Sequence, residues 1–268
     1  MTIETNSRLR RVEGRHNTQI KDLRRAFDSG ELSADGVCAI EGMRIIEEAI
    51  RSGLRLQAVF FSASAEGRAH KLLPQLAANV ETLLLPEKLF QSAVPSESPQ
   101  GVAALVRCKQ FTVEEVVDRA SVGPLVAVSG LQDPGNLGTI LRSAEAFGAG
   151  GVLLGEGTVS AFNSKVVRAS AGSVFRLPLA KTKLLPLLPS LAGVRLVATS
   201  SHGGSTLHEA KLSGPLAIFI GSEGAGLPKD LLTKMDATVV IPHSAQVESL
   251  NAGVAASIVL YEAARQRG

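Results

Sequence analysis

Residues 241–267 read IPHSAQVESLNAGVAASIVLYEAARQR, and this stretch decides how the rest of the chain is interpreted. It follows directly from a β-type run over residues 238–241. It ends in an apolar-periodic segment that predicts a helix, on which Val254, Ile258 and Tyr261 share a face. The strand and the helix are joined by a polar turn, which is the unusual part of the stretch.

Two polar residues, Ser249 and Asn251, flank Leu250 at the point where this helix should begin. Both are good N-cap residues, because their side-chain oxygens accept hydrogen bonds from the free backbone amides of a first helical turn. One helix needs only one cap. Since a helix N-terminus also attracts anions and polar ligands, the second polar residue points to a binding site.

Length and composition favour a compact α/β protein. The chain has 268 residues, 45% of them hydrophobic, with no Trp and a single Tyr. This is long enough for two domains, each with its own core. A net charge of +3 permits a polyanionic partner without requiring one.

The two cysteines and the absence of long apolar runs bear on the cellular compartment. Cys38 and Cys108 form no ligand pattern, and we expect reduced, buried thiols in a cytoplasmic protein. The N-terminus has no apolar signal core, and no later run is long enough to span a membrane.

Residues 1–19 are predicted to form a basic N-terminal tail. Arg8, Arg10, Arg11 and Arg15 lie close together there. Two interpretations remain open: a frayed, solvated terminus, or an arm that contacts phosphates.

A first domain is predicted over residues 20–108, because apolar runs and helical patterns alternate there. We expect a small α/β sandwich. Its strands are expected at 37–40, 56–61, 80–85 and 101–107, and its helices at 20–28, 41–53, 66–77 and after Pro86. Residues 109–123 are charged and helical in pattern, and we expect a linker there.

A second domain is predicted over residues 124–268. It begins with a continuous apolar strand at 124–130, as in the middle of a parallel sheet. After a turn around Asp133 comes a helix that ends at Gly148. Arg142 lies about 200° around this helix from Ile140, so it should point away from the core.

Two further strand ends carry glycines. The strand at 194–200 runs into SHGGST, and the strand at 216–221 runs into GSEGAGLP, which contains Glu223. Glycines at the carboxyl end of a strand allow close approach of a ligand, although plain loops remain an alternative. The spacing fits neither a dinucleotide fingerprint nor a phosphate loop, and no histidine pattern predicts a metal site.

Three motifs in order carry a family resemblance. NLGTILRSAEAFGA at 136–149, IFIGSEGAGLP at 218–228 and IPHSAQVESLNAGVAASIVLYEAAR at 241–265 resemble the motifs of the SpoU, or TrmH-like, branch of the SPOUT RNA methyltransferases. The segment NSKVVRASAGSVFRLP, between the first and second motifs, also resembles the family segment at that position. The first domain is similar to the substrate-binding domain found ahead of this catalytic domain, with a fold like that of kink-turn-binding ribosomal proteins.

The resemblance implies an enzyme that transfers a methyl group from S-adenosyl-L-methionine to a ribose 2'-hydroxyl of RNA. It also implies an α/β catalytic domain with a parallel sheet and a deep C-terminal trefoil knot, and a homodimer whose active sites use both subunits. Spacing alone predicts an ordinary doubly wound sheet, because knots are so rare.

The resemblance also assigns site residues. Its catalytic positions correspond to Asn136, Arg142, Glu223, Ser249 and Asn251. Its cofactor positions correspond to Gly221, Ile241 and Leu250, with another wall from the loop that includes Thr199 and Ser200. His243 departs from the family pattern, in which Met is usual, and this change touches the cofactor loop.

Several alternatives stay open from the sequence. The domain ahead of the catalytic motifs favours 23S rRNA as the substrate, and a tRNA substrate is the alternative. A catalytically inactive RNA-binding or ribosome-assembly factor is the alternative from another functional class. The family account gives the hydroxyl proton to Arg142, but an arginine normally stays protonated. Arg142 would otherwise clamp an RNA phosphate.

Overall fold

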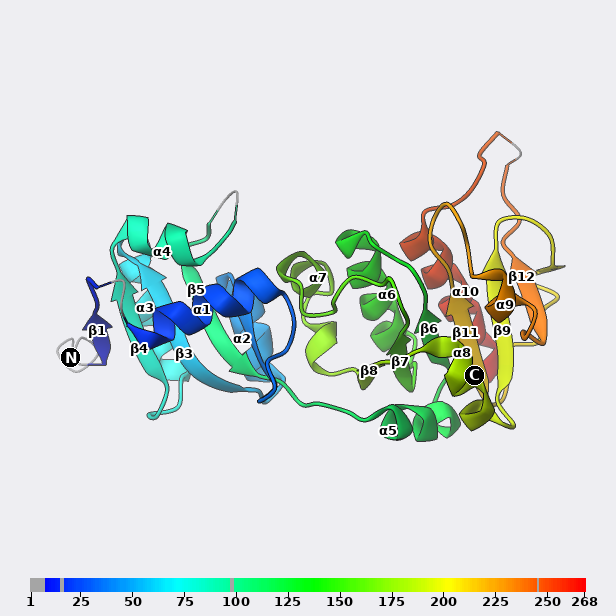
Figure 1. The fold of residues 1–268 in the computed structure, drawn as a ribbon, viewed down its shortest axis with the longest axis horizontal. Helices are drawn as coiled ribbons and strands as arrows, with labels where there is room; N and C mark the ends of the chain where they lie inside the picture. The colour runs from blue at the N-terminus through cyan, green and yellow to red at the C-terminus, as the bar shows by residue number, and fades with distance from the viewer. Residues whose placement is uncertain (1–7, 15–16, 97–98, 245) are drawn as a thin grey trace. The chain divides into compact units, whose positions relative to one another are not determined.

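The computed structural model describes residues 8–14, 17–96, 99–244 and 246–268, and it contains two compact units (Figure 1). The first unit combines Met1–Lys109 with Ser160–Phe175, and the second combines Gln110–Val159 with Arg176–Gly268. A short segment from the second half of the sequence therefore packs with the first unit. It contains α7 (Ser164–Ala169) and the 3-10 turn η5 (Ser173–Phe175), and α7 lies against β2.

The first unit is built on a five-stranded mixed sheet. The strand order is β1-β4-β3-β5-β2, in which β5 runs antiparallel to both of its neighbours and the other pairs are parallel. The strands are β1 (Leu9–Arg11), β2 (Val37–Glu41), β3 (Arg55–Ser62), β4 (Glu81–Leu85) and β5 (Val102–Arg107). This arrangement matches the strands expected at 37–40, 56–61, 80–85 and 101–107.

Helices pack on this sheet and bury most residues of β2, β3, β4 and β5. α1 (Thr18–Ser29) and α4 (Glu87–Ala93) share a core with Phe60 and Leu83. α2 (Met43–Arg51) packs on β2 and β5. α3 (Glu66–Leu72), flanked by the 3-10 turns η2 (Ala63–Ala65) and η3 (Leu73–Gln75), packs on β3. The predicted α/β sandwich is present.

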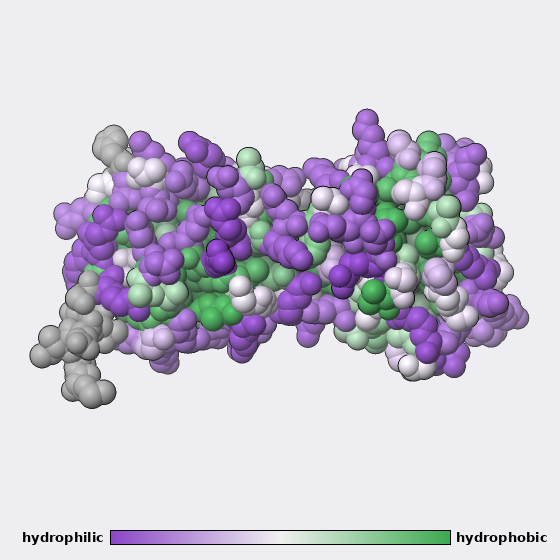
Figure 2. All heavy atoms as spheres, turned by 90° about the horizontal axis from the view of Figure 1, so that it is seen from below, coloured by the Kyte–Doolittle hydropathy of each residue, from purple (hydrophilic) through white to green (hydrophobic). Residues whose placement is uncertain are grey.

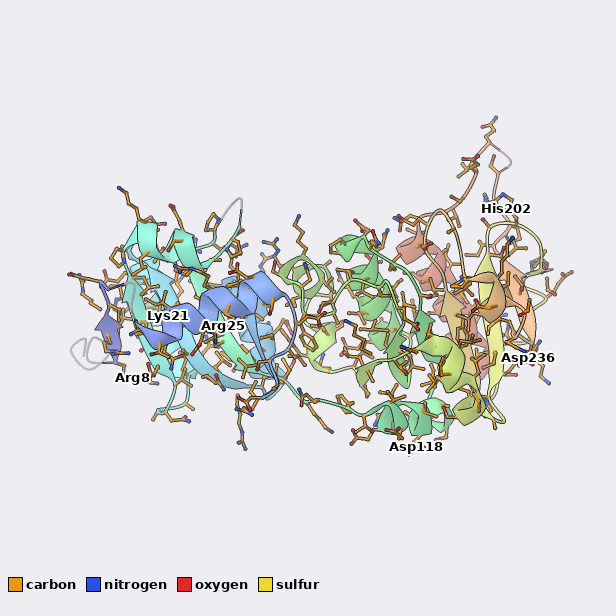
Figure 3. The ribbon with its side chains drawn as sticks, in the orientation of Figure 1. Arg8, Lys21, Arg25, Asp118, His202 and Asp236 are labelled. Atoms are coloured by element: carbon orange, nitrogen blue, oxygen red, sulfur yellow. The ribbon has the colours of Figure 1, made fainter. Side chains whose placement is uncertain are left out.

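The described N-terminal residues 8–14 include a strand, β1, so this part of the basic segment is not frayed. β1 adds to the sheet edge by parallel pairing with β4. Arg8 (labelled in Figure 3), Arg10 and Arg11 all have partners within the unit. These are the carbonyl oxygens of Leu73, Leu76 and Ala77 for Arg8, the carboxylate of Glu81 for Arg10 and that of Glu66 for Arg11. Arg15 lies outside the described residues.

Residues 109–123, expected to form a linker, are largely packed into the second unit. They form α5 (Val113–Val117) and the 3-10 turn η4 (Asp118–Ser121). A capping box begins α5, in which Thr112 and Glu115 exchange side-chain to backbone hydrogen bonds. Val116 is fully buried, so this segment contributes to the core of the second unit.

The second unit contains a seven-stranded sheet that is parallel throughout, which confirms the predicted α/β fold class. The strand order is β10-β12-β9-β11-β6-β7-β8. The strands are β6 (Leu125–Val128), β7 (Gly151–Leu154), β8 (Leu179–Lys181), β9 (Arg195–Ser200), β10 (Ser205–Thr206), β11 (Leu216–Ile220) and β12 (Ala237–Val240). The short edge strands β8 and β10 were not expected from the sequence.

Two layers of helices cover this sheet. One face carries α5, α8 (Leu184–Leu187) with the 3-10 turn η6 (Leu188–Leu191), and α9 (Lys229–Leu232), which share a core with β6, β9 and β11. On the other face α6 (Pro134–Ala146) and α10 (Ala252–Arg267) pack closely against each other. Gly253 permits this approach, because a Cβ there would lie 3.0 Å from Cβ of Thr139.

The last helix, α10, has one buried side and one exposed apolar side. Ala256, Val259 and Leu260 are fully buried. Val254 and Tyr261, expected on one face, are 47% and 55% exposed, and the Tyr261 ring packs edge-on against Phe147. The face of the molecule in Figure 2 is largely hydrophilic, with apolar side chains between the polar ones.

The cysteines match their expectation. Cys38 and Cys108 are buried free thiols with 3.5 Å between their Sγ atoms. The hydrogen bond with Cys108 and burial raise the pKa of the Cys38 thiol. Within the described part of the chain, no helix has the length and apolarity needed to cross a membrane.

Candidate functional site

A cavity of about 290 Å³ opens at the carboxyl ends of β9, β11 and β12. This edge is where ligands bind in open parallel α/β sheets. Apolar side chains form part of its wall, and hydroxyl groups and backbone form the rest. The lining comprises Thr199, Ser200, Ser201, His202, Ile220, Gly221, Ser222, Glu223, Gly224, Ala225, Gly226, Leu227, Leu232, Val239, Ile241, His243, Ser249, Leu250, Ala252 and Ala255.

All five residues assigned to the cofactor by resemblance line this cavity: Thr199, Ser200, Gly221, Ile241 and Leu250. The turn after β11 folds back on its own strand, where Ser222 and Gly226 form a bridge. A Cβ at Gly221 would lie 2.2 Å from the carbonyl carbon of Gly226. Only glycine therefore allows this turn to close beside the cavity.

Glu223 extends from that turn and meets Asn136 at the beginning of α6. Asp133 is the N-cap of α6, and its carboxylate accepts a hydrogen bond from the backbone N–H of Asn136 at 2.7 Å. Because the cap is supplied by Asp133, the Asn136 side chain is free for another contact. Its Nδ2 donates a hydrogen bond to Oε1 of Glu223. The first and second motifs thus meet through two side chains.

Ser249 and Asn251 have different local roles. Asn251 is the N-cap of α10, since its Oδ1 accepts a hydrogen bond from Val254 N at 3.1 Å. Ser249 does not cap the helix, and it lines the cavity together with Leu250. The structure therefore resolves which of the two polar residues forms the cap, and it leaves the Asn251 amide nitrogen as a donor.

Arg142 is exposed on α6, as its position on the helix predicts. It follows Asn136 by six residues and is not part of the cavity wall. Among the described residues it has no hydrogen-bond or ion-pair partner. Four of the five predicted catalytic residues therefore gather at or beside the cavity, and the guanidinium of Arg142 does not reach it within one chain.

Two histidines, His202 and His243, also line the cavity. The sequence pattern did not predict His202 as a site residue. His202 lies on the loop after β9 (labelled in Figure 3), where its Nδ1 is 2.7 Å from Oγ of Ser201. His243 Nδ1 is 2.7 Å from the carbonyl oxygen of Ile241. A carbonyl can only accept, so Nδ1 of His243 carries the proton, and its Nε2 is an acceptor when the ring is neutral. The glycines of the loop after β9 were the available signal for His202.

The cavity suits a nucleoside with a positively charged substituent. Leu227, Val239 and Leu250 offer apolar surface for a base, and Thr199 and Ser200 offer hydroxyl groups. Among the described side chains in the wall, Glu223 is the one that bears a carboxyl group. These features match an adenosine that carries a sulfonium group.

The parallel sheet, the cavity at its carboxyl edge and the contact between the first two motifs form the arrangement in which open α/β proteins bind ligands. Comparison with family models specifies the class. Residues 123–261 match the SpoU rRNA Methylase family, and residues 17–104 match the MRM3-like substrate binding domain. The chain belongs to the SpoU rRNA methylase family, as the three motifs predict.

Relatives resemble the chain over nearly its whole length. The 23S rRNA (guanosine(2553)-2'-O)-methyltransferase RlmP of Bacillus subtilis is 30% identical over 94% of this chain and 98% of its own. The AdoMet-bound rRNA methyltransferase from Sinorhizobium meliloti is 27% identical, with a TM-score of 0.78 over 96% of this chain and 98% of its own. The SpoU methyltransferase AviRb from Streptomyces viridochromogenes, in complex with AdoMet, is also 27% identical, with a TM-score of 0.78 over 94% and 98%.

Proposed function

We propose that this protein transfers a methyl group from S-adenosyl-L-methionine to a ribose 2'-hydroxyl of RNA, with 23S rRNA as the substrate. The observation that carries the proposal is the hydrogen bond between Asn136 and Glu223 beside the nucleoside-shaped cavity. It joins two family motifs that lie 87 residues apart in sequence. Similarity to RlmP along nearly the whole chain supports rRNA over tRNA.

Each site residue has a role in this proposal. The bound cofactor supplies a methyl group that its sulfonium makes electrophilic. Backbone groups of Gly221, Ile241 and Leu250 hold its adenosine part, with Thr199 and Ser200 as another wall. Ser249 and the amide nitrogens of Asn136 and Asn251 orient the hydroxyl, because a weak nucleophile must be aligned with the methyl group.

The proposal extends to the assembly. The chain forms a homodimer through the second unit, and the exposed apolar side of α10, with Val254 and Tyr261, forms part of the interface. Arg142 of the partner subunit then completes the site. The C-terminal part of the chain forms the deep trefoil knot of its family, residues 20–108 bind the RNA, and the enzyme works in the cytoplasm.

The substitution Arg142→Ala tests this function. Arg142 is exposed and outside the cavity wall, so cofactor affinity measured by calorimetry should stay within about threefold of wild type. Methyl transfer to rRNA should fall to a small residual rate, because a guanidinium that clamps phosphate cannot be replaced by a methyl side chain. Near-normal turnover in this variant would contradict the proposed site.

The substrate needs a separate experiment. Sites of 2'-O-methylation are mapped in rRNA and tRNA from cells with and without the protein. We expect one site to disappear from 23S rRNA and the tRNA profile to stay unchanged. Loss of a tRNA site would identify tRNA as the substrate, and no change in either RNA would leave an inactive RNA-binding factor as the better interpretation.

A further inference from the structure

One step of methyl transfer, the removal of the hydroxyl proton, has no assigned proton acceptor so far. A guanidinium has five N–H donors and no acceptor, and it stays protonated in proteins. Within its own chain Arg142 is also exposed and outside the cavity wall, so it can approach the cavity only from the partner subunit. The proton acceptor should instead be a group that has a free lone pair and lines the cavity.

We propose that Glu223 is the proton acceptor in methyl transfer and that Arg142 serves only to clamp RNA phosphate. This inference rests on the proposed function. Glu223 lines the cavity on the turn after β11, and it is exposed enough to meet a hydroxyl group of RNA. The geometry also makes it a positioned base, since Asn136 holds one of its two oxygens.

The contact with Asn136 explains why this carboxylate can act in a fixed direction. Nδ2 of Asn136 donates to Oε1, and the backbone of Asn136 is held in turn by the Asp133 carboxylate at 2.7 Å. No described residue donates a hydrogen bond to Oε2. A carboxylate has lone pairs on both oxygens, so Oε2 can accept a proton while Oε1 keeps its partner.

The proposed step is balanced within the site. The ribose oxygen forms a bond to the methyl carbon, and the carbon–sulfur bond breaks with its electron pair passing to sulfur. The hydroxyl proton moves to Oε2 of Glu223, which becomes a neutral carboxylic acid. The same negative charge favours the sulfonium form of the cofactor over the neutral thioether product.

Two histidines are the rival acceptors, because both line the same cavity. His243 presents Nε2 as an acceptor, and His202 has Nδ1 beside Ser201. Neither is in contact with a residue of the first motif, whereas Glu223 is. Other titratable or charged groups lie on the elements around Glu223, namely His202, His243, Asp133, Arg142, Glu145, Glu156, Lys229 and Asp230.

Single-turnover methylation of a 23S rRNA fragment is measured as a function of pH for wild type and Glu223→Gln. The glutamine can still accept from Asn136 and keeps the size of the side chain. We expect the rate to fall about 100-fold or more, and the decline in rate toward acid pH to disappear. Arg142→Ala should keep that decline in its residual activity, because its acceptor is intact.

Cofactor binding gives a readout that does not depend on activity. In Glu223→Gln, the affinity for S-adenosylhomocysteine should equal that of wild type. The affinity for S-adenosylmethionine should fall about tenfold from its wild-type value. Glu248→Gln is the matched control, since Glu248 is an exposed carboxylate near Ser249 that does not line the cavity. Thermal unfolding confirms that each variant is folded.

The outcomes separate this inference from the proposed function. Methylation by wild type establishes the function whichever residue takes the proton. If Glu223→Gln keeps the acid decline, or if His243→Gln or His202→Gln removes it, the assignment to Glu223 is overturned while the function stands. If wild type methylates no RNA, the function and the acceptor assignment both fail.

Discussion

The beginnings of α6 and α10 bring similar residues to the site in different ways. Each helix begins beside the cavity with an asparagine that the family resemblance assigns to the site. In α6 the cap is Asp133, and Asn136 is free to hold Glu223. In α10 the assigned residue, Asn251, is itself the cap.

In α6, the residue that caps the helix and the residue assigned to the site are different, whereas in α10 the single residue Asn251 has both roles. An N-cap contributes about 1 kcal/mol to stability, so a substitution of Asn251 changes the fold and the site together. A substitution of Asn136 leaves the α6 cap in place. The two helices pack closely where Gly253 lies against Thr139.

The largest effect is expected from Asn136→Ala. It removes the hydrogen bond to Glu223 while Asp133 still caps α6, so unfolding free energy should fall by about 1 kcal/mol or less. Methyl transfer should fall about 100-fold, because the carboxylate loses its orientation. Urea unfolding and single-turnover assays measure the two quantities, and turnover within threefold of wild type would contradict the role of this contact.

The crossing of the two helices is tested by Gly253→Ala. The added Cβ would lie 3.0 Å from Cβ of Thr139 and 3.3 Å from the carbonyl oxygen of Asn136, so these neighbours must give way by a few tenths of an ångström in a tightly packed crossing. We expect a loss of about 1–2 kcal/mol in unfolding free energy. Gly224→Ala is the control, because nothing lies within 4 Å of a Cβ there. Equal stability of the two variants would show that the crossing tolerates a methyl group.

The double role of Asn251 is tested by a pair of substitutions. Asn251→Ala should lower unfolding free energy by about 1 kcal/mol, because the bond to Val254 N is lost. Asn251→Asp should keep the cap and the stability, since a carboxylate oxygen accepts the same bond. Both should reduce methylation if the amide nitrogen orients the hydroxyl. Full activity of the Asp variant would limit Asn251 to capping.

Most of the fold could be predicted because its signals are local. Apolar runs and glycine stops placed the central strands, and the outward position of Arg142 followed from helical geometry. The edge strands β1, β8 and β10 were missed, since two or three residues carry no period. The arginines of β1 were misleading, because the sequence cannot show that Glu66 and Glu81 lie nearby to pair with them.

The site was predictable only in part. The sequence showed two candidate N-cap residues, Ser249 and Asn251, where one helix needs only one cap. It did not show which of them forms the cap. The contact between Asn136 and Glu223 depends on how the chain folds between them, so only the family resemblance pointed to it. Val254 and Tyr261 fit the helical period of α10, yet the period alone cannot distinguish a core face from an exposed apolar face.

The smallest effect is expected at the far end of α10, where stability and function should be independent. Hydrogen bonds from Arg265 and then Gln266 lower the pKa of Glu262 to about 2 from 4.5. The folded pKa is the lower one, so this stabilisation is present above pH 4.5 and is lost as pH falls toward 2.

Glu262→Gln should lower unfolding free energy by about 0.5 kcal/mol at pH 7, since Arg265 is largely exposed. The difference from wild type in urea unfolding should shrink as pH falls below 4.5 and vanish once pH falls below about 2. Methylation at pH 7 should stay unchanged, because Glu262 lies about three turns from Asn251 and outside the cavity wall. A difference that persists in acid would mean that packing of Glu262, and not its charge, holds this end of the helix.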